Sequence, residues 1–139
     1  MMEMKKNPGD PFSHVSFRLH QLNGAFFMFG GIMADHELNV KQWERIRAYV
    51  LRRDRFLDQI ALRYGKRIDA NQVHHIFPRE FFPQYTYSDW NLITVSQASH
   101  NSLHDRTGHK LSDKGWELLK RTARAQGIEL SPGLRKILT

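Results

Sequence analysis

Cysteine is absent from this 139-residue chain, and so is any long uncharged run of hydrophobic residues. Without cysteine the chain can form neither a disulfide nor a cysteine-ligated zinc site. The hydrophobic run at residues 24–34 is too short to span a bilayer, and Gly30 and Gly31 interrupt it. The first ten residues contain no hydrophobic segment of the kind that signal peptides have. These absences predict a cytoplasmic protein with no membrane helix.

The length and the hydrophobic content indicate one small domain. Hydrophobic residues make up 40% of the sequence, an ordinary share for a globular protein, and a chain of this length can bury one core. We place the domain at residues 39–126, after an N-terminal extension at 1–38 and before a C-terminal tail at 127–139, where we expect loose packing from residue 130 onward. In the extension, the turn signal Asn23-Gly24 and an alternation of hydrophobic and polar residues predict a β-hairpin over 14–29.

Five residues in the middle of the chain have a spacing that suits a metal site with a base beside it: His74, His75, Asn91, His100 and His104. His74 and His75 are adjacent, so on a strand their side chains point to opposite faces. His100 and His104 are four residues apart, so on a helix they share one face. One face can therefore gather His74, His100 and His104 around a divalent metal ion, while His75 stays free to take a proton from water. A chance match at all five positions is the poorer explanation.

Positive charge is concentrated on both sides of this motif. The net charge of the chain is +7. Residues 41–67 hold nine Lys and Arg against three Asp and Glu, residues 106–139 hold eight against three, and the stretch 68–105 between them has a net charge of −3. Basic segments attract a nucleic acid backbone by releasing counterions, whatever the base sequence. A solvated helix face is the alternative for either segment by itself, but two such segments around a histidine motif favour DNA as the partner.

At these positions the chain resembles the HNH endonucleases, also called ββα-metal nucleases. The resemblance covers residues 39–125 and is carried by Val73-His74-His75-Ile76-Phe77-Pro78, by Asp89-Trp90-Asn91-Leu92-Ile93 and by the run 100–106. The basic segment 41–54 and the segment 110–115 are similar to parts that flank the motif in phage members. The resemblance implies an α+β fold, a small and mainly helical domain around a ββα-metal motif. It also implies an endonuclease that hydrolyses phosphodiester bonds in DNA, by nicking or by double-strand cleavage.

The chain departs from this family at a structural zinc site. Many phage HNH proteins carry two Cys-x-x-Cys pairs, which would fall at Leu57 and Ile60 and at Ser96 and Ser99 of this chain. The first pair has become hydrophobic, so we expect packing to hold the two halves of the domain together in place of the zinc. The second pair has become small and polar, which suits the start of a helix. The structural metal is therefore lost, whereas the catalytic set is intact.

Local patterns place the motif on a strand, a loop, a second strand and a helix. Asn39 and Ser112 are suitable N-caps, and Gly127 is a suitable helix end. Trp43 and Trp116 fall on hydrophobic helix faces and are expected in the core rather than as platforms for bases. The expected elements are helices at 39–53, 55–64, 96–106 and 112–126 and strands at 72–77 and 92–95.

The resemblance implies a role for each residue of the motif. His75 is the expected general base, because imidazole titrates near neutral pH, and Asn91 is expected to hold the loop that orients it. His74, His100 and His104 are the expected ligands of a divalent metal ion, which would be Mg, Mn, Ni or Zn. Three imidazoles favour Zn, Ni or Mn, whereas two imidazoles with water would make Mg or Mn more plausible. His104 is the ligand that some HNH proteins lack.

Arginines near the motif are candidates for contact with DNA: Arg52, Arg53, Arg79 and Arg106. Arg79 and Arg106 could hold the phosphate by paired hydrogen bonds, and an exposed arginine without such a role is an equal alternative. Double-strand cleavage would call for two copies, as in a homodimer, and the likeness to phage proteins implies the genome packaging machinery as a partner. Two alternatives stay open: a catalytically silent DNA-binding protein of HNH fold, and a phage-assembly protein whose histidines bind zinc only to hold the fold.

Overall fold

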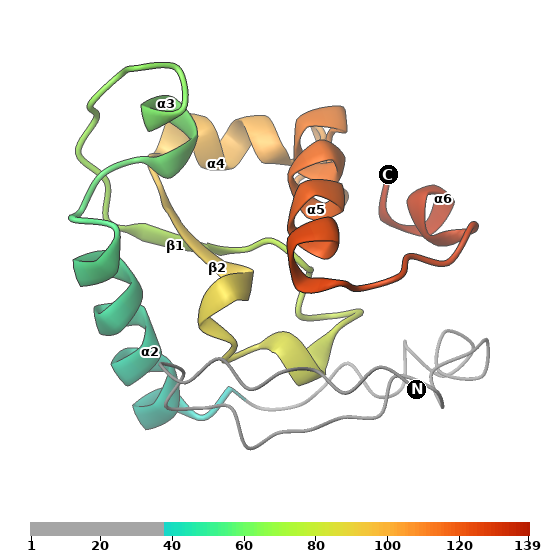
Figure 1. Cartoon of the computed structure of the whole chain (residues 1–139), viewed down its shortest axis with the longest axis horizontal. Coiled ribbons are helices and arrows are strands. Elements are labelled where there is room, and N and C mark those ends of the chain that lie inside the picture. The colour runs from blue at the N-terminus through green and yellow to red at the C-terminus, as the bar shows by residue number, and fades with distance from the viewer. Residues whose placement is uncertain (1–37) are drawn as a thin grey trace.

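The computed structural model describes residues 38–139 (Figure 1). The hairpin expected over 14–29 lies outside the described residues. Five α-helices and one two-stranded antiparallel sheet occur in residues 38–139, so the expected α+β class is confirmed. In chain order the elements are α2 (Val40–Arg53), α3 (Gln59–Leu62), β1 (Gln72–His75), the 3₁₀ helices η2 (Pro83–Tyr85) and η3 (Asp89–Asn91), β2 (Leu92–Val95), α4 (Gln97–Leu103), α5 (Asp113–Gln126) and α6 (Leu134–Leu138). In the described part of the chain no helix has the length and hydrophobicity to cross a membrane.

The β-hairpin separates two layers of helices. β1 and β2 pair in antiparallel register, with His74 opposite Ile93 and His75 opposite Leu92. Residues directly opposite each other share a face of the sheet. Ile93 belongs to the main core with α5, whereas Leu92 packs against α2 in a smaller cluster. The two adjacent histidines therefore face different layers, and Figure 1 shows the hairpin running between α2 and α5.

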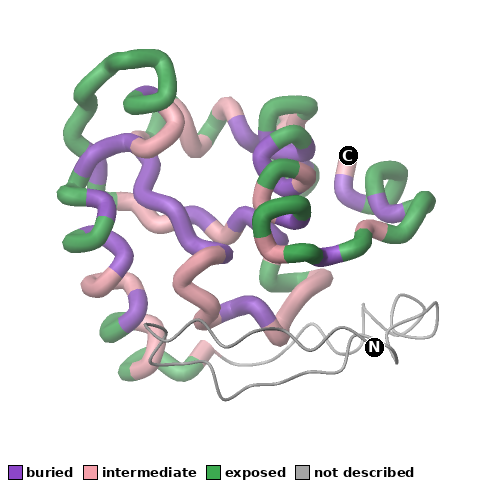
Figure 2. Tube along the Cα trace, in the orientation of Figure 1, coloured by how far each residue is buried: buried purple, intermediate pink, exposed green. Residues whose placement is uncertain are grey.

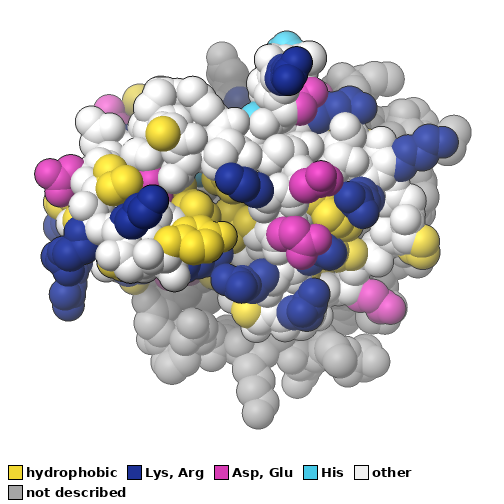
Figure 3. Space-filling model, turned by 90° about the horizontal axis from the view of Figure 1, so that it is seen from above, with side chains coloured by type: hydrophobic (Ala, Val, Ile, Leu, Met, Phe, Trp, Pro, Cys, Tyr) yellow, Lys and Arg dark blue, Asp and Glu magenta, His cyan; other side chains and the backbone are white. Residues whose placement is uncertain are grey.

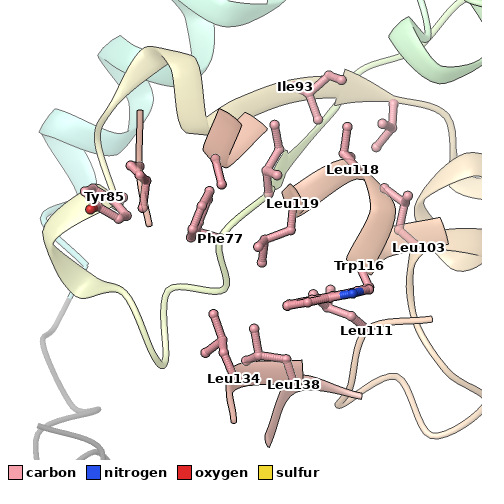
Figure 4. Close-up of a cluster of buried hydrophobic side chains, with 14 residues drawn as sticks. Phe77, Tyr85, Ile93, Leu103, Leu111, Trp116, Leu118, Leu119, Leu134 and Leu138 are labelled. Carbon is pink, nitrogen blue, oxygen red and sulfur yellow. The ribbon is translucent and has the colours of Figure 1, made fainter. Parts of the chain in front are cut away.

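The main core lies between the hairpin, α5 and α6. Burial is concentrated on β2, of which every residue is buried, and on one side of α5 (Figure 2). Trp116 and Leu119 of α5 are buried there, as the helical spacing predicts. The prediction of a loosely packed tail is wrong, because Leu134 and Leu138 of α6 are each only 2% exposed and point into this core (Figure 4). The carbonyl oxygen of Leu138 also accepts a hydrogen bond from the amide of Leu111 at 2.7 Å.

The corner between α2 and α3 differs from the helix that we expected at 55–64. Arg55 and Phe56 adopt the left-handed backbone conformation, with φ angles of 57° and 55°, and end the first helix. This conformation costs about 1–2 kcal/mol for a residue with a Cβ, so helix propensity gives no sign of it. The amide of Phe56 bonds the carbonyl of Leu51 at 2.9 Å, and its carbonyl accepts from Ala70 at 2.8 Å. Only one helical turn follows, after the N-cap Asp58.

This corner sets two buried carboxylates along the outer edge of β2. Asp54 accepts a hydrogen bond from the amide of Thr94 at 2.9 Å. Asp58 accepts from the amide of Ser96 at 3.0 Å and from its hydroxyl at 2.5 Å. An edge strand leaves alternate backbone groups unpaired, and here side chains from the helical corner bind them.

The same contacts join the two halves of the domain where the zinc-binding pairs of the phage proteins would fall. Leu57 is buried and Ile60 packs against the main core. Between them, the completely buried Asp58 adds a polar link that the sequence did not reveal. Burial alone would raise the pKa of Asp58, but hydrogen bonds from Ser96 and Ser99 and from backbone amides hold it below its ordinary value. The carboxylate therefore stays charged at neutral pH.

A close contact between α4 and α5 sets the end of α4. A Cβ at Gly115 would collide with the carbonyl oxygen of Leu103, so a glycine is required where the helices meet. Ser112 caps α5 as predicted, since its hydroxyl oxygen accepts from the amide of Gly115 at 3.2 Å, and its own amide bonds the carbonyl of Leu103 at 3.0 Å. The helix expected to reach residue 106 therefore ends at Leu103, and His104 lies just beyond it.

Candidate metal centre and active site

Three histidines from β1 and the end of α4 converge on one point. The metal-binding nitrogen atoms of His74, His100 and His104 all lie within 4.8 Å of one another. The ring centroid of His74 is 5.3 Å from that of His100 and 5.1 Å from that of His104. Imidazole nitrogen binds zinc at about 2.0–2.1 Å, so small side-chain rotations would bring all three nitrogens onto one ion. The structure thus brings together the three residues that the sequence proposes as ligands.

Two of these rings have a nitrogen atom that fits a bound metal ion. His74 Nε2 and His104 Nδ1 are buried and have no hydrogen-bond partner among the described residues. A buried polar atom without a partner costs about 1–3 kcal/mol, which a bound cation would offset. Imidazole is a suitable ligand for zinc, nickel, copper and iron. The donor set and the two unpaired atoms therefore fit a divalent transition metal.

The protonation state of the cluster also suits a metal. Burial, followed by the charges of His104 and His100, lowers the pKa of His74 from 6.5 to about 3. Burial and the charge of His100 lower the pKa of His104 as well. A histidine must be neutral to bind a metal, so these two rings are in the binding form at neutral pH. A hydrogen bond to the backbone of Lys110 further orients His104.

His75 is held at two points on the other face of β1. Its Nε2 lies 2.9 Å from the carbonyl oxygen of Thr86, and its ring stacks on that of Trp43 with a centroid distance of 5.1 Å and an interplanar angle of 19°. A carbonyl oxygen only accepts, so Nε2 carries the proton and Nδ1 keeps its lone pair. Burial and the positive charge of Arg79 lower the pKa of His75, although the bond to Thr86 opposes them. The half-buried ring is therefore neutral at pH 7 and able to accept a proton at Nδ1.

Asn91 ties together the loop between the two strands. It is completely buried. Its Oδ1 accepts from the amide of Phe77 at 2.7 Å, and its Nδ2 donates to the carbonyl oxygens of Phe77 at 3.2 Å and Tyr85 at 3.1 Å. Thr86, whose carbonyl holds His75, follows Tyr85 directly. We therefore propose Asn91 as a positioning residue that acts on His75 through the backbone, rather than as a residue that touches the substrate.

Comparison with known proteins adds one solved structure. No family model matches the chain, and no curated protein matches it. The chain is similar to the crystal structure of an HNH endonuclease of the deep-sea thermophilic bacteriophage GVE2 with manganese ion, at 36% identity and a TM-score of 0.43. The match covers 44% of this chain and 66% of that one, slightly less than two thirds of its length. This similar structure is an HNH endonuclease, the family that the sequence motif resembles.

Two contacts of the histidine motif were not predicted from the sequence. Trp43 was expected only as a core residue, yet its indole restrains the His75 ring. The carbonyl of Thr86 fixes the tautomer of the same ring. The helical spacing of Trp43 with Ile46 and Val50 shows that they share a face, but not that α2 crosses the hairpin at His75. A backbone carbonyl leaves no signal in the sequence.

Replacing Trp43 with alanine is expected to lower kcat for DNA cleavage about tenfold, because an aromatic stack contributes about 0.5–1.5 kcal/mol and 1.4 kcal/mol corresponds to a factor of ten. KM and metal affinity should change little, because Trp43 contacts His75, the proposed general base, and not the proposed metal ligands. Steady-state kinetics on an oligonucleotide duplex would measure both constants. Trp43→Phe keeps a stacking ring and should recover most of the loss. Equal losses in the two variants would show that the stack does not position His75.

The arginines near the histidine motif fall into two groups. Arg53 is used within the protein: its guanidinium bonds the Asp54 carboxylate and donates to the carbonyl oxygens of Asp89 at 2.8 Å and Leu92 at 2.7 Å. We therefore leave Arg53 out of the proposed DNA contacts. The side chains of the remaining three are exposed and form no hydrogen bond or ion pair within the described part of the chain: Arg52, Arg79 and Arg106. Of these, Arg79 lowers the pKa of His75 by its positive charge and so lies near the His75 ring.

Proposed function

We propose that the protein is a metal-dependent HNH endonuclease that hydrolyses phosphodiester bonds in DNA. The observation that carries this proposal is the histidine arrangement. Three imidazole nitrogens form one group, two of them buried and unpaired, and the adjacent His75 is held with a free Nδ1. Hydrolysis of a phosphodiester needs an activated water and neutralisation of the charge that builds on the phosphate. The arrangement supplies a base to activate the water, and it supplies ligands for a cation that would neutralise the charge on the phosphate.

The proposed mechanism divides the work between the two faces of β1. A divalent ion held by His74, His100 and His104 would act as a Lewis acid on the phosphate and the departing 3′-oxygen. His75 Nδ1 takes a proton from the attacking water as the oxygen bonds to phosphorus. The Thr86 carbonyl stabilises the resulting imidazolium, because it accepts the hydrogen bond from Nε2–H. The bond to the 3′-oxygen breaks, and this oxygen takes up a proton from solvent, which leaves the 5′-phosphate and 3′-hydroxyl ends that the resemblance implies.

The charge distribution supports DNA as the substrate. Nine Lys and Arg lie in residues 41–67, which include α2, and eight lie in residues 106–139, which include α5 and α6. Arg79 places a positive charge near His75, the proposed general base, where the scissile phosphate would approach. Contacts of this kind go to phosphates and carry no base sequence information. We therefore expect strong salt dependence of binding and little base preference from these arginines.

A plasmid cleavage assay with a panel of metals tests the proposal. Purified protein should convert supercoiled plasmid to nicked or linear DNA with at least one of Mn²⁺, Ni²⁺, Zn²⁺ and Mg²⁺, and EDTA should stop the reaction. The ratio of nicked to linear product separates single-strand from double-strand cleavage. End-labelling of the product would identify the 5′-phosphate. If DNA binds but no metal supports cleavage, the protein is a DNA-binding module of HNH fold instead.

The remaining alternative is a metal that serves only to hold the fold. Thermal unfolding with and without EDTA separates it from the proposal. A purely structural ion would leave the chain unfolded after chelation, whereas an ion at an active site should cost only part of the stability. The buried contacts of α5 and α6 and the Asp58 network do not involve the histidines, so we expect a folded protein in EDTA.

A further inference from the structure

A cavity of about 500 Å³ opens between α3 and α5, and no histidine is among its described lining residues. Arg63 follows α3 on one side, Arg121 lies on α5 on the other, and Trp90 and Ile93 contribute to the wall between them. A volume of this size is in the range of small-ligand sites and exceeds that of a single phosphate ion. In the space-filling view, hydrophobic side chains lie in a hollow between the two halves of the molecule and Lys and Arg side chains border it (Figure 3).

The charges that face this cavity are unbalanced. Arg53 and Asp54 also line it, but they neutralise each other in an ion pair at 2.8 Å. The guanidinium groups of Arg63 and Arg121 form no hydrogen bond or ion pair with any residue between 38 and 139. Burial, and then the charge of Arg121, lower the pKa of Arg63, which shows that the two guanidinium groups act on each other. Two like charges at one cavity repel, and an anion between them would remove that repulsion.

The rest of the lining matches a nucleotide better than a bare ion. Trp90 is half-buried, packs edge-on against Tyr85 at a centroid distance of 4.8 Å and forms part of the cavity wall. An aromatic ring beside basic groups is the usual arrangement for holding a base and its phosphate, because every base has a face that can stack. Gln126 adds an amide group at the same cavity, whereas the Nε2 of Gln59 already donates to the backbone carbonyls of Asp54 and Leu57. Guanidinium groups bind phosphate well because they offer paired donors.

We propose that this cavity is a second binding site, which takes the phosphate of a nucleotide between Arg63 and Arg121 and places the base near Trp90. The site is separate from the histidine cluster and does not depend on the proposed nuclease activity. A mononucleotide and a nucleotide within a DNA strand share this chemistry. The 3′-hydroxyl is free in a mononucleotide, whereas in a DNA strand it is linked to the next nucleotide.

NMR titration of the full chain tests the proposal, by following the Nε–H signals of arginine and the indole N–H of Trp90. The probes are inorganic phosphate, deoxythymidine 5′-monophosphate and a short single-stranded oligonucleotide, each added to zinc-loaded protein and again in EDTA. Saturable shifts of Arg63 and Arg121 are expected in both conditions, and the monophosphate should also shift Trp90. Binding by the monophosphate alone would assign the site to free nucleotides. Binding by the oligonucleotide alone would assign it to a strand.

The double variant Arg63→Gln/Arg121→Gln should weaken binding of the effective probe at least tenfold. Arg124→Gln is the matched control, because Arg124 is exposed on the same helix and does not line the cavity, and it should change the affinity less than twofold. If none of the three probes shifts Arg63 and Arg121, or if the control weakens binding as much as the double variant, the cavity is not a phosphate site. Loss of cleavage in the metal assay would leave this result unchanged, so the two proposals fail separately.

Discussion

Replacing His75 with alanine is expected to lower kcat for DNA cleavage by about 10²- to 10⁴-fold, the usual contribution of a positioned general base. The reason is the free lone pair on Nδ1, which the hydrogen bond from Nε2 to Thr86 leaves facing away from that carbonyl. His75 lies on the opposite face of β1 from His74, so its removal should leave the metal ligands in place. Single-turnover cleavage of a labelled duplex would measure the rate, and calorimetric titration with Mn²⁺ would measure the metal affinity.

His109→Ala is the matched control for this experiment. His109 is exposed in the turn after His104 and is not part of the ligand group. Its replacement should change the cleavage rate less than twofold. A His75→Ala protein that binds metal and still cleaves at the normal rate would remove His75 from the mechanism. A variant that loses both cleavage and metal would show that His75 supports the ligands instead.

Replacing Asp58 with alanine is expected to lower the free energy of unfolding by about 3 kcal/mol or more, the largest loss that we expect from one polar side chain. Asp58 is completely buried and accepts hydrogen bonds from the amides of Ile60, Ala61 and Ser96. The Ser96 hydroxyl also donates to it. Removal leaves these donors buried without partners, and the link between α3 and β2 is lost. Urea denaturation of the metal-free protein would measure the change.

Asp113→Ala is a suitable comparison for Asp58→Ala. The Asp113 carboxylate is 88% exposed and forms a surface ion pair with Arg135 at 3.1 Å. Pairs of this kind contribute about 0–1 kcal/mol, so the loss should be small. Similar losses in the two variants would mean that the buried network contributes no more than a surface contact.

The stabilisation by Asp58 should also depend on pH. Its pKa is lower in the folded protein than in the unfolded chain, where aspartate titrates near 3.9. The unfolded state therefore binds more protons in acid, and the stabilisation is present above pH 3.9 and lost as the pH falls through the folded pKa. The difference in stability between the wild type and Asp58→Ala should accordingly shrink below about pH 3.9.

Local patterns in the sequence were sufficient for the histidines and for most of the elements. Alternation along a strand puts His74 and His75 on different faces, and capping by Asn39 and Ser112 starts α2 and α5 where expected. These features depend on neighbouring residues only. For His104 the local pattern was insufficient. The contact with α5 at Gly115 ends α4 at Leu103, so His104 joins the histidine cluster from outside the helix.

What the sequence could not predict depends on contacts between distant segments. The left-handed corner at Arg55 and Phe56 opposes local preference and persists through bonds to Leu51 and Ala70. The packing of α6 depends on the main core, which other elements form. The spacing of Leu134 and Leu138 alone therefore did not distinguish a packed helix from a loose tail. Asp58 appears in the sequence as an ordinary N-cap, and only the fold brings Ser96 to it.

The carboxylates beside β2 also help to fix which of the two neighbouring histidines, His74 or His75, faces the proposed metal site. Sliding one strand of a hairpin past the other by a single position turns every side chain over to the opposite surface. Such a shift in β1 would exchange the faces of His74, the proposed ligand, and His75, the proposed base, without any change of sequence. Asp54 binds the amide of Thr94 in β2, Asp58 binds the amide of Ser96 just after β2, and Trp43 of α2 stacks on His75 at the end of β1. Both strands are therefore held by the helical segment 43–58. A short hairpin, marginal when isolated, thereby keeps a single alignment.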